Sequence, residues 1–270
     1  AFALQIDAKI VPLPTSIEQS FALPDVDAFR EKITPRTKAI MICNPGNPTG
    51  VLYPRESLEK LKQVCLEHDL YLISDEVYRE FTYDGLQHHS VLGLSELDEN
   101  TMVVDSISKR FSACGARIGC VITRNESLLG AMNKFAQARL SPPTLGQIGA
   151  QAVYQLPTSY YQQVNSEYAA RRNTLKTALQ AMPGVLCPEI NGAFYAMVGL
   201  PIEDADHFCK WILDDFQHEG QTVMMAPGPG FYATPNAGRN QVRLAYVLQQ
   251  ADLKAAMAVL EQALAMYPGR

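Results

Sequence analysis

The 270-residue sequence lacks several features that would place it in other protein classes. No apolar run approaches the roughly 20 residues that a membrane-spanning helix needs. The net charge is −5, so the basic surface that binds nucleic acid is not expected. Six cysteines include no Cys-x-x-Cys pair, and five histidines show no metal-ligand spacing. We therefore expect no membrane, nucleic-acid partner or metal, and reduced thiols typical of the cytoplasm.

The composition that remains is that of a globular protein with a buried sheet. Hydrophobic residues make up 47% of the chain and charged residues 19%. Apolar runs that alternate with helix-periodic segments indicate an α/β fold, and there are no repeats or low-complexity segments. We expect helices over 24–33, 56–68, 127–139, 145–154, 159–181, 205–217 and 252–265, and strands over 10–14, 39–43, 70–74, 102–105, 118–123, 194–198, 222–226 and 241–246.

Polar residues follow three of the apolar runs at the points where the runs end. The first run is followed by an Asn/Pro/Gly turn over 44–50, the second by Asp75 and Tyr78, and the third by Ser106 and Lys109. Taken alone, the segment 44–50 is well explained as a tight turn, Asp75 as a capping or ion-paired carboxylate, and Lys109 as a surface lysine. Ligands bind at the carboxyl ends of parallel strands, so the three ends together predict one site.

Lys109 gives this predicted site its chemistry. A lysine at a strand end can form an imine with an aldehyde, and neighbouring hydroxyls with an arginine can hold a phosphate. Lys109 lies between Ser106 and Ser108 on one side and Arg117 on the other. An aldehyde and a phosphate on one small molecule describe pyridoxal 5'-phosphate, and we predict it as the cofactor.

The two other strand ends supply partners for the ring of such a cofactor. Asp75 would lie against the pyridine nitrogen and keep it protonated, which makes the ring an electron sink. Asn47 and Tyr78 would donate hydrogen bonds to the phenolic oxygen of the ring. We therefore expect Asn47, Asp75 and Tyr78 to bind the cofactor together with the lysine and the phosphate residues.

These motifs resemble the class I/II aminotransferase family of fold-type I pyridoxal-phosphate enzymes. The resemblance covers essentially the whole chain, because further matches lie in 191–195 and 226–231. It implies that Arg243 clamps the α-carboxylate of the substrate, with Asn47 beside it. The matching positions are Asn44 to Gly50, the pair Asp75 and Tyr78, the set Ser106, Lys109, Arg117 and Gly119, and Arg243.

The resemblance also implies a fold and a domain organisation. It is an aspartate-aminotransferase-like α/β fold, with a large domain built on a mostly parallel seven-stranded sheet and a small α+β domain. Residues 1–165 would form the carboxyl-terminal part of the large domain, and residues 166–270 the small domain. Family members are longer at the amino end, so we expect a chain that lacks the first part of the large domain. Homodimers are the family expectation.

The activity implied is transfer of an amino group between an amino acid and a 2-oxo acid through a Lys109 imine. Lys109, Asp75 and Tyr78 would be the catalytic residues. Two alternatives stay open on the same residues. One is a carbon–sulfur β-lyase or related fold-type I enzyme, and the other is an aminotransferase-like effector domain of a transcription regulator.

Overall fold

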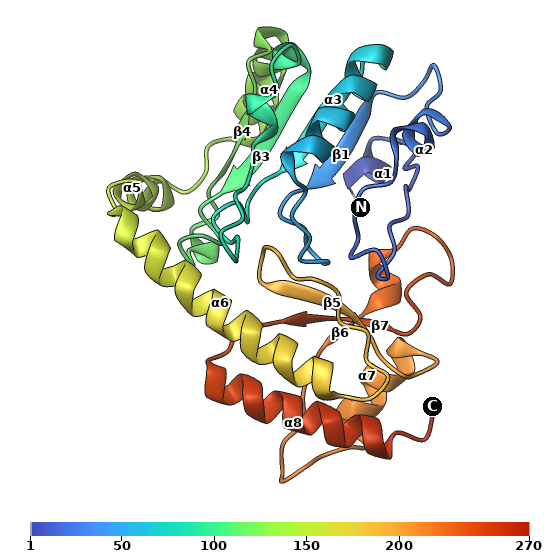
Figure 1. The fold of residues 1–270 in the computed structure, drawn as a ribbon. Helices are drawn as coiled ribbons and strands as arrows, with labels where there is room; N and C mark the ends of the chain where they lie inside the picture. Colours follow the sequence, from blue (N-terminus) through green and yellow to red (C-terminus); the bar gives the residue numbers. More distant parts are fainter. Residues whose placement is uncertain (1, 270) are drawn as a thin grey trace.

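The first of two sheets contains the strands whose ends carry the predicted site. The computed structural model describes residues 2–269. The strand order is β1-β2-β3-β4, with the first three parallel and β4 antiparallel to β3. Figure 1 shows these strands in the upper part of the molecule. Their bounds are β1 Ala39–Cys43, β2 Tyr71–Asp75, β3 Thr101–Ser106 and β4 Gly119–Ile122.

Helix α3 (Arg55–His68) covers one face of this sheet. Its apolar residues recur at helical spacing, and Leu58, Leu61 and Val64 are buried against Leu72 of β2. The helix ends where Asp69 adopts a left-handed conformation, with φ of 51°. The opposite face of the sheet is more open. Exposed apolar side chains on it are Met41, Val104 and Val121, and α4 (Glu126–Arg139) has no buried residue.

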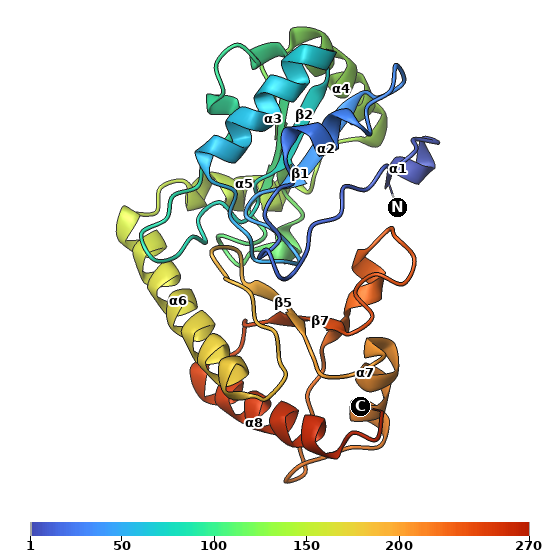
Figure 2. The ribbon, with the colours of Figure 1, turned by 45° about the vertical axis from the view of Figure 1, so that its right-hand side comes forward.

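The second sheet is antiparallel and has the order β5-β7-β6. Helices α6 and α8 lie side by side below it in both orientations of the ribbon (Figures 1 and 2). The three strands are β5 Tyr195–Gly199, β6 Ala226–Pro227 and β7 Gln241–Ala245, and the helices are α6 Thr158–Ala181, α7 Ala205–Asp214 and α8 Gln250–Met266. Side chains of β5, β7 and the three helices form one core.

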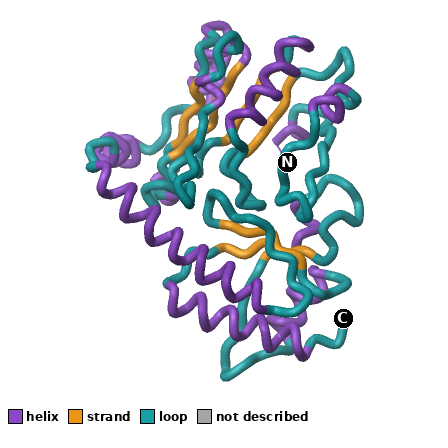
Figure 3. Tube along the Cα trace, viewed as in Figure 1, coloured by secondary structure: helices purple, strands orange, loops and turns teal. Residues whose placement is uncertain are grey.

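The segment after β2 belongs to this second core. Tyr78, Phe81 and Tyr83 are buried with Phe194 of the chain leading into β5. The Phe81 and Phe194 rings meet edge to face at 5.1 Å, and the Tyr83 hydroxyl donates to the Ala193 carbonyl at 2.5 Å. Figure 3 shows the loops that lie between the two groups of strands. The packing brings the carboxyl ends of β1, β2 and β3 next to the second sheet.

Two predicted strands and two predicted helices differ from the structure, and the helix expected over 205–217 ends at Asp214. Residues 10–14 form no strand, because Pro12 and Pro14 have no N–H to donate to a ladder. The strand expected over 222–226 is reduced to Ala226–Pro227, which pairs with β7. The helix expected over 24–33 is α2, Val26–Arg30. The remaining helices are α1 Phe2–Gln5 and α5 Thr144–Val153.

Within residues 2–269, no helix is both long and apolar enough to cross a membrane.

Candidate active site

One cavity lies at the carboxyl ends of β1, β2 and β3. Its volume is about 610 Å³, which is within the usual range for small-molecule sites. The structure brings together there every predicted site residue except Arg243. These lining residues are Asn47, Asp75, Tyr78, Ser106, Ser108, Lys109 and Arg117.

Asp75 is the last residue of β2, between Cys43 of β1 and Val104 of β3. One of its carboxylate oxygens accepts a hydrogen bond from the Val77 main-chain N–H at 3.1 Å. Burial, with a smaller contribution from Asp105, raises the pKa of Asp75, while Val77 and Lys109 oppose the shift. A cation placed beside this half-buried carboxylate would therefore be stabilised.

Asn47 joins the first sheet to the second. Its side-chain N–H donates to the Tyr78 hydroxyl at 3.4 Å, and its amide oxygen accepts from Nη1 of Arg243 at 3.1 Å. Tyr78 is buried, and burial followed by the neighbouring Tyr195 raises the pKa of its hydroxyl. The hydroxyl therefore keeps its proton at neutral pH and can donate a hydrogen bond.

Arg243 reaches this site from β7, the central strand of the second sheet. Its guanidinium carbon lies 4.6 Å from the centre of the Tyr195 ring and 4.8 Å from that of Phe231. Such contacts hold the planar group in one orientation. Its buried Nε has no hydrogen-bond partner among the described residues. The arrangement suits a guanidinium that binds a carboxylate.

The phosphate-binding residues predicted from sequence lie around the turn after β3. The Ser106 hydroxyl accepts from the Ser108 main-chain N–H at 3.2 Å. Arg117 has a left-handed backbone, with φ of 55°, and its Nη1 donates to the Cys114 carbonyl at 2.9 Å. Two hydroxyls and an exposed guanidinium on one cavity wall are a donor set that suits a phosphate dianion.

Comparison with known families decides what this arrangement belongs to. The sequence model of aminotransferase class I and II matches residues 5–260. The chain belongs to this family. Enzymes of the class I and II family depend on pyridoxal phosphate.

Individual aminotransferases agree with this membership. The chain is 37% identical to the aspartate aminotransferase of Bacillus subtilis over 229 residues, which are 82% of this chain and 56% of that protein. A solved double mutant of Thermus thermophilus aspartate aminotransferase is 31% identical, with a TM-score of 0.83 over 95% of this chain and 64% of that one. An aromatic aminotransferase from Pyrococcus horikoshii has a TM-score of 0.86 at 31% identity, over 96% and 68%.

These matches confirm the predicted aspartate-aminotransferase-like, fold-type I architecture. This aminotransferase-family chain spans 56% of the length of the Bacillus protein and 64% of the Thermus one.

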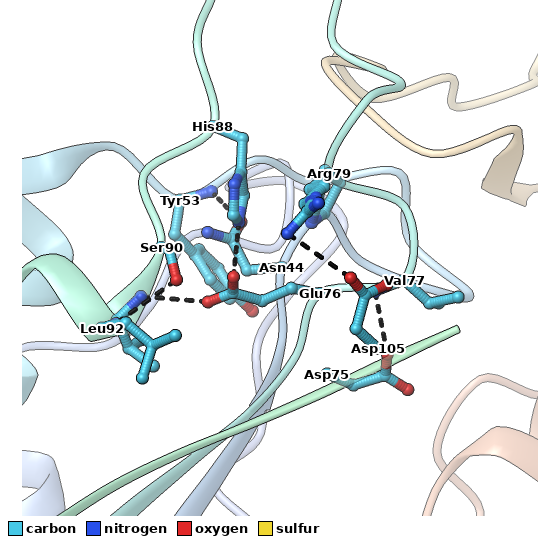
Figure 4. Close-up of polar contacts among 12 residues, drawn as sticks. Asn44, Tyr53, Asp75, Glu76, Val77, Arg79, His88, Ser90, Leu92 and Asp105 are labelled. Carbon is cyan, nitrogen blue, oxygen red and sulfur yellow. Dashed lines mark hydrogen bonds and ion pairs between the residues drawn. The ribbon is translucent and has the colours of Figure 1, made fainter. Parts of the chain in front are cut away.

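Sequence reasoning missed a charged network at the wall of the cavity of this aminotransferase-family chain, where Asp105 is one of the lining residues. Asp105 is buried in β3 and accepts from the Ser106 N–H at 2.7 Å. Its carboxylate pairs with Arg110. The carboxylate also lies 3.4 Å from Arg79 (Figure 4). Arg110 also approaches Glu80 at 3.6 Å. The sequence signal for this network is Asp105 itself, a charged residue within an apolar strand, because a buried charge requires a partner.

Proposed function

We propose that this protein transfers an amino group between an amino acid and a 2-oxo acid, with pyridoxal phosphate as its cofactor. One observation carries the proposal. Lys109, Asp75 and Tyr78 line a single cavity, and Arg243 reaches its edge through Asn47 at 3.1 Å. Family membership and the aminotransferase names of the relatives support the same activity.

The residues present fit the cofactor. Lys109 would hold its aldehyde carbon, Asp75 its ring nitrogen, and Asn47 and Tyr78 its phenolic oxygen. The pKa of Asp75 is raised, so a cationic neighbour would stabilise its ionised carboxylate. A protonated ring nitrogen is such a neighbour. The phosphate would lie against Ser106, Ser108 and Arg117. When bound, the cofactor supplies an electron-withdrawing ring that makes the Cα proton of an attached amino acid acidic.

Substrate binding and proton transfer are then carried out by the side chains of the site. Arg243 binds the α-carboxylate of the substrate through two N–H groups and so fixes its orientation. Asn47 holds the guanidinium in place through its amide oxygen, at 3.1 Å. The substrate amine would displace Lys109 from the aldehyde carbon, and the freed Lys109 amine would then accept the proton from Cα and give it up again, as a general base and acid.

Two alternatives use the same residues. A carbon–sulfur β-lyase would release a thiol, pyruvate and ammonia instead of exchanging an amino group, and an effector domain would bind the ligand without turnover. The names of the relatives favour transfer, since the three compared above are all aminotransferases. Incubation with an amino acid and a 2-oxo acid, followed by separate measurement of the new amino acid and of thiol, distinguishes the three.

We extend the proposal to the organisation of the whole protein. The division at residue 166, within α6, is supported by the two sheets and their separate cores. A homodimer is supported by the exposed apolar side chains Phe135 and Leu145, since large apolar surfaces mark interfaces. A cytoplasmic location is supported by the six cysteines, all of them unpaired.

The decisive test is covalent capture of the cofactor. Pyridoxal phosphate is added to the chain, borohydride fixes it to the lysine with which it has condensed, and peptide mass mapping locates the adduct. We expect the adduct on Lys109, and its loss together with amino-group transfer in Lys109→Ala. Lys254→Ala, at an exposed position of α8, is the matched control and should keep both. An adduct on another lysine, or transfer retained without Lys109, contradicts the proposal.

A further inference from the structure

Glu76 and His88 form a buried pair directly behind the candidate site (Figure 4). Their side chains are 1% and 8% exposed, and Oε2 of Glu76 lies 3.6 Å from Nε2 of His88. Neither of these two atoms has a hydrogen-bond partner among residues 2–269. The other carboxyl oxygen of Glu76 accepts from the Val91 main-chain N–H at 3.0 Å.

The pair connects three segments that shape the cavity. Glu76 directly follows Asp75, and its main-chain N–H continues the ladder to the Val104 carbonyl at 3.0 Å. Because successive side chains of an extended chain point to opposite sides, Glu76 points away from the cavity that Asp75 lines. The His88 ring lies near the main chain of Asn44, at the start of the turn that carries Asn47, and this neighbour raises its pKa.

The surroundings of the His88 ring indicate which of its two nitrogens carries the proton. A neutral imidazole has one N–H donor and one acceptor nitrogen. Nε2 has no hydrogen-bond partner among the described residues, so we assign the N–H to Nδ1, which leaves Nε2 as the acceptor. This acceptor faces Oε2 of Glu76. The two atoms attract each other only if the carboxyl group carries a proton, or if the imidazole is doubly protonated.

The surroundings favour the neutral arrangement. Burial raises the pKa of Glu76, while the hydrogen bond from the Val91 main chain, the nearby hydroxyls of Ser90 and Ser74 and the charge of Arg79 oppose the shift. Burial also lowers the pKa of His88 to about 4, and the positive Arg79 and the neighbouring His89 add to this shift. Asp105 and the main chain of Asn44 act in the other direction, but burial is the largest cause for both groups.

We propose that Glu76 and His88 form a neutral pair, with the carboxyl proton of Glu76 on Oε2 and directed toward the unprotonated Nε2 of His88, 3.6 Å away. The pair is a positioning device, because it fixes the ends of β1 and β2 and with them Asn47, Asp75 and Tyr78. This positioning role rests on the function proposed above. The protonation state of the pair does not.

Substitution of Glu76 separates a neutral pair from an ion pair. In Glu76→Gln the amide N–H replaces the carboxyl O–H toward His88, and the amide oxygen still accepts from Val91. We therefore expect Glu76→Gln to melt and to bind pyridoxal phosphate like the parent chain. Glu76→Ala should melt lower and bind the cofactor roughly tenfold more weakly, because a buried acceptor and donor are left unpaired. Glu261→Ala, at an exposed position of α8, is the control.

The proton itself is observed by nitrogen NMR of the chain labelled at histidine, with His88→Asn to assign the resonance. We expect one donor and one acceptor nitrogen in His88 from pH 8 down to pH 5, and loss of that pattern only in more acid solution. An imidazolium spectrum at pH 7, or a Glu76→Gln variant as impaired as Glu76→Ala, overturns the proposal. The NMR and melting experiments need no cofactor, so they stand if the proposed function fails.

Discussion

Replacement of Arg243 by lysine tests how the second sheet contributes to substrate binding. The guanidinium lies between the rings of Tyr195 and Phe231, at 4.6 and 4.8 Å, and donates to Asn47 at 3.1 Å. Lysine keeps the positive charge but has no planar pair of donors. The variant therefore removes the bidentate geometry and the ordered stacking and leaves the electrostatic attraction in place.

The expected loss follows from these contacts. One charge-assisted hydrogen bond to a carboxylate contributes about 1.5–3 kcal/mol. The guanidinium stacks on two rings in a more ordered way than a lysine ammonium does, and this contributes about 0.5–1 kcal/mol. Together these amount to about 2–4 kcal/mol, or a roughly 30- to 700-fold weaker binding of an α-amino acid at about 1.4 kcal/mol per factor of ten.

The assay compares an α-amino acid with the matched amine that lacks the carboxylate. Both are titrated into the chain loaded with pyridoxal phosphate, and the change in cofactor absorbance gives each dissociation constant. Arg243→Lys should weaken the amino acid by the factor above and leave the amine nearly unchanged. Arg239→Lys, at an exposed arginine near Asp204, is the control. Equal weakening of both ligands would refute the assignment, since it would indicate a general disturbance of the site.

Two further predictions concern stability. Burial raises the pKa of Asp75 above its unfolded value of 3.8, so ionisation of Asp75 destabilises the folded chain as the pH rises from 3.8 through the raised pKa. Without cofactor, Asp75→Asn should therefore have a higher melting temperature than the parent at pH 7, and the difference should shrink toward pH 4. Thermal unfolding of both chains at the two pH values checks this. A lower melting temperature of the variant than of the parent at pH 7 contradicts it. Leu72→Ala removes a fully buried side chain and should cost about 2–5 kcal/mol in urea unfolding. Met41→Ala, at a position 70% exposed, should change stability by no more than about 0.5 kcal/mol.

Local sequence patterns predicted most of the fold because the elements carry their own signals. The three parallel strands are apolar runs bounded by polar turns, and α3 shows helical spacing of Leu58 and Leu61. The patterns failed where pairing depends on distant partners. The apolar residues 10–14 were mistaken for a strand although two prolines interrupt them, and only two residues of the region 222–227 pair with β7.

The site was predictable to the extent that it lies at strand ends. Asp75, Ser106 and Lys109 each follow an apolar run, and parallel pairing brings such ends to one edge. The place of Arg243 depends on how the second sheet packs against the loop after β2, and only family resemblance supplied it. The pair of Glu76 and His88 went unnoticed because burial, which gives it meaning, is a tertiary property.

Asn47 shows why the two sheets must be considered as one site. Its amide presents a donor to the Tyr78 hydroxyl and an acceptor to Arg243, so a single side chain connects the residue proposed for the cofactor ring with the residue proposed for the substrate carboxylate. An aspartate at this position would keep the acceptor and lose the donor. Its charge would also pair with Arg243 and compete with the substrate for the guanidinium. A neutral amide meets both requirements, because it orients the arginine without neutralising it.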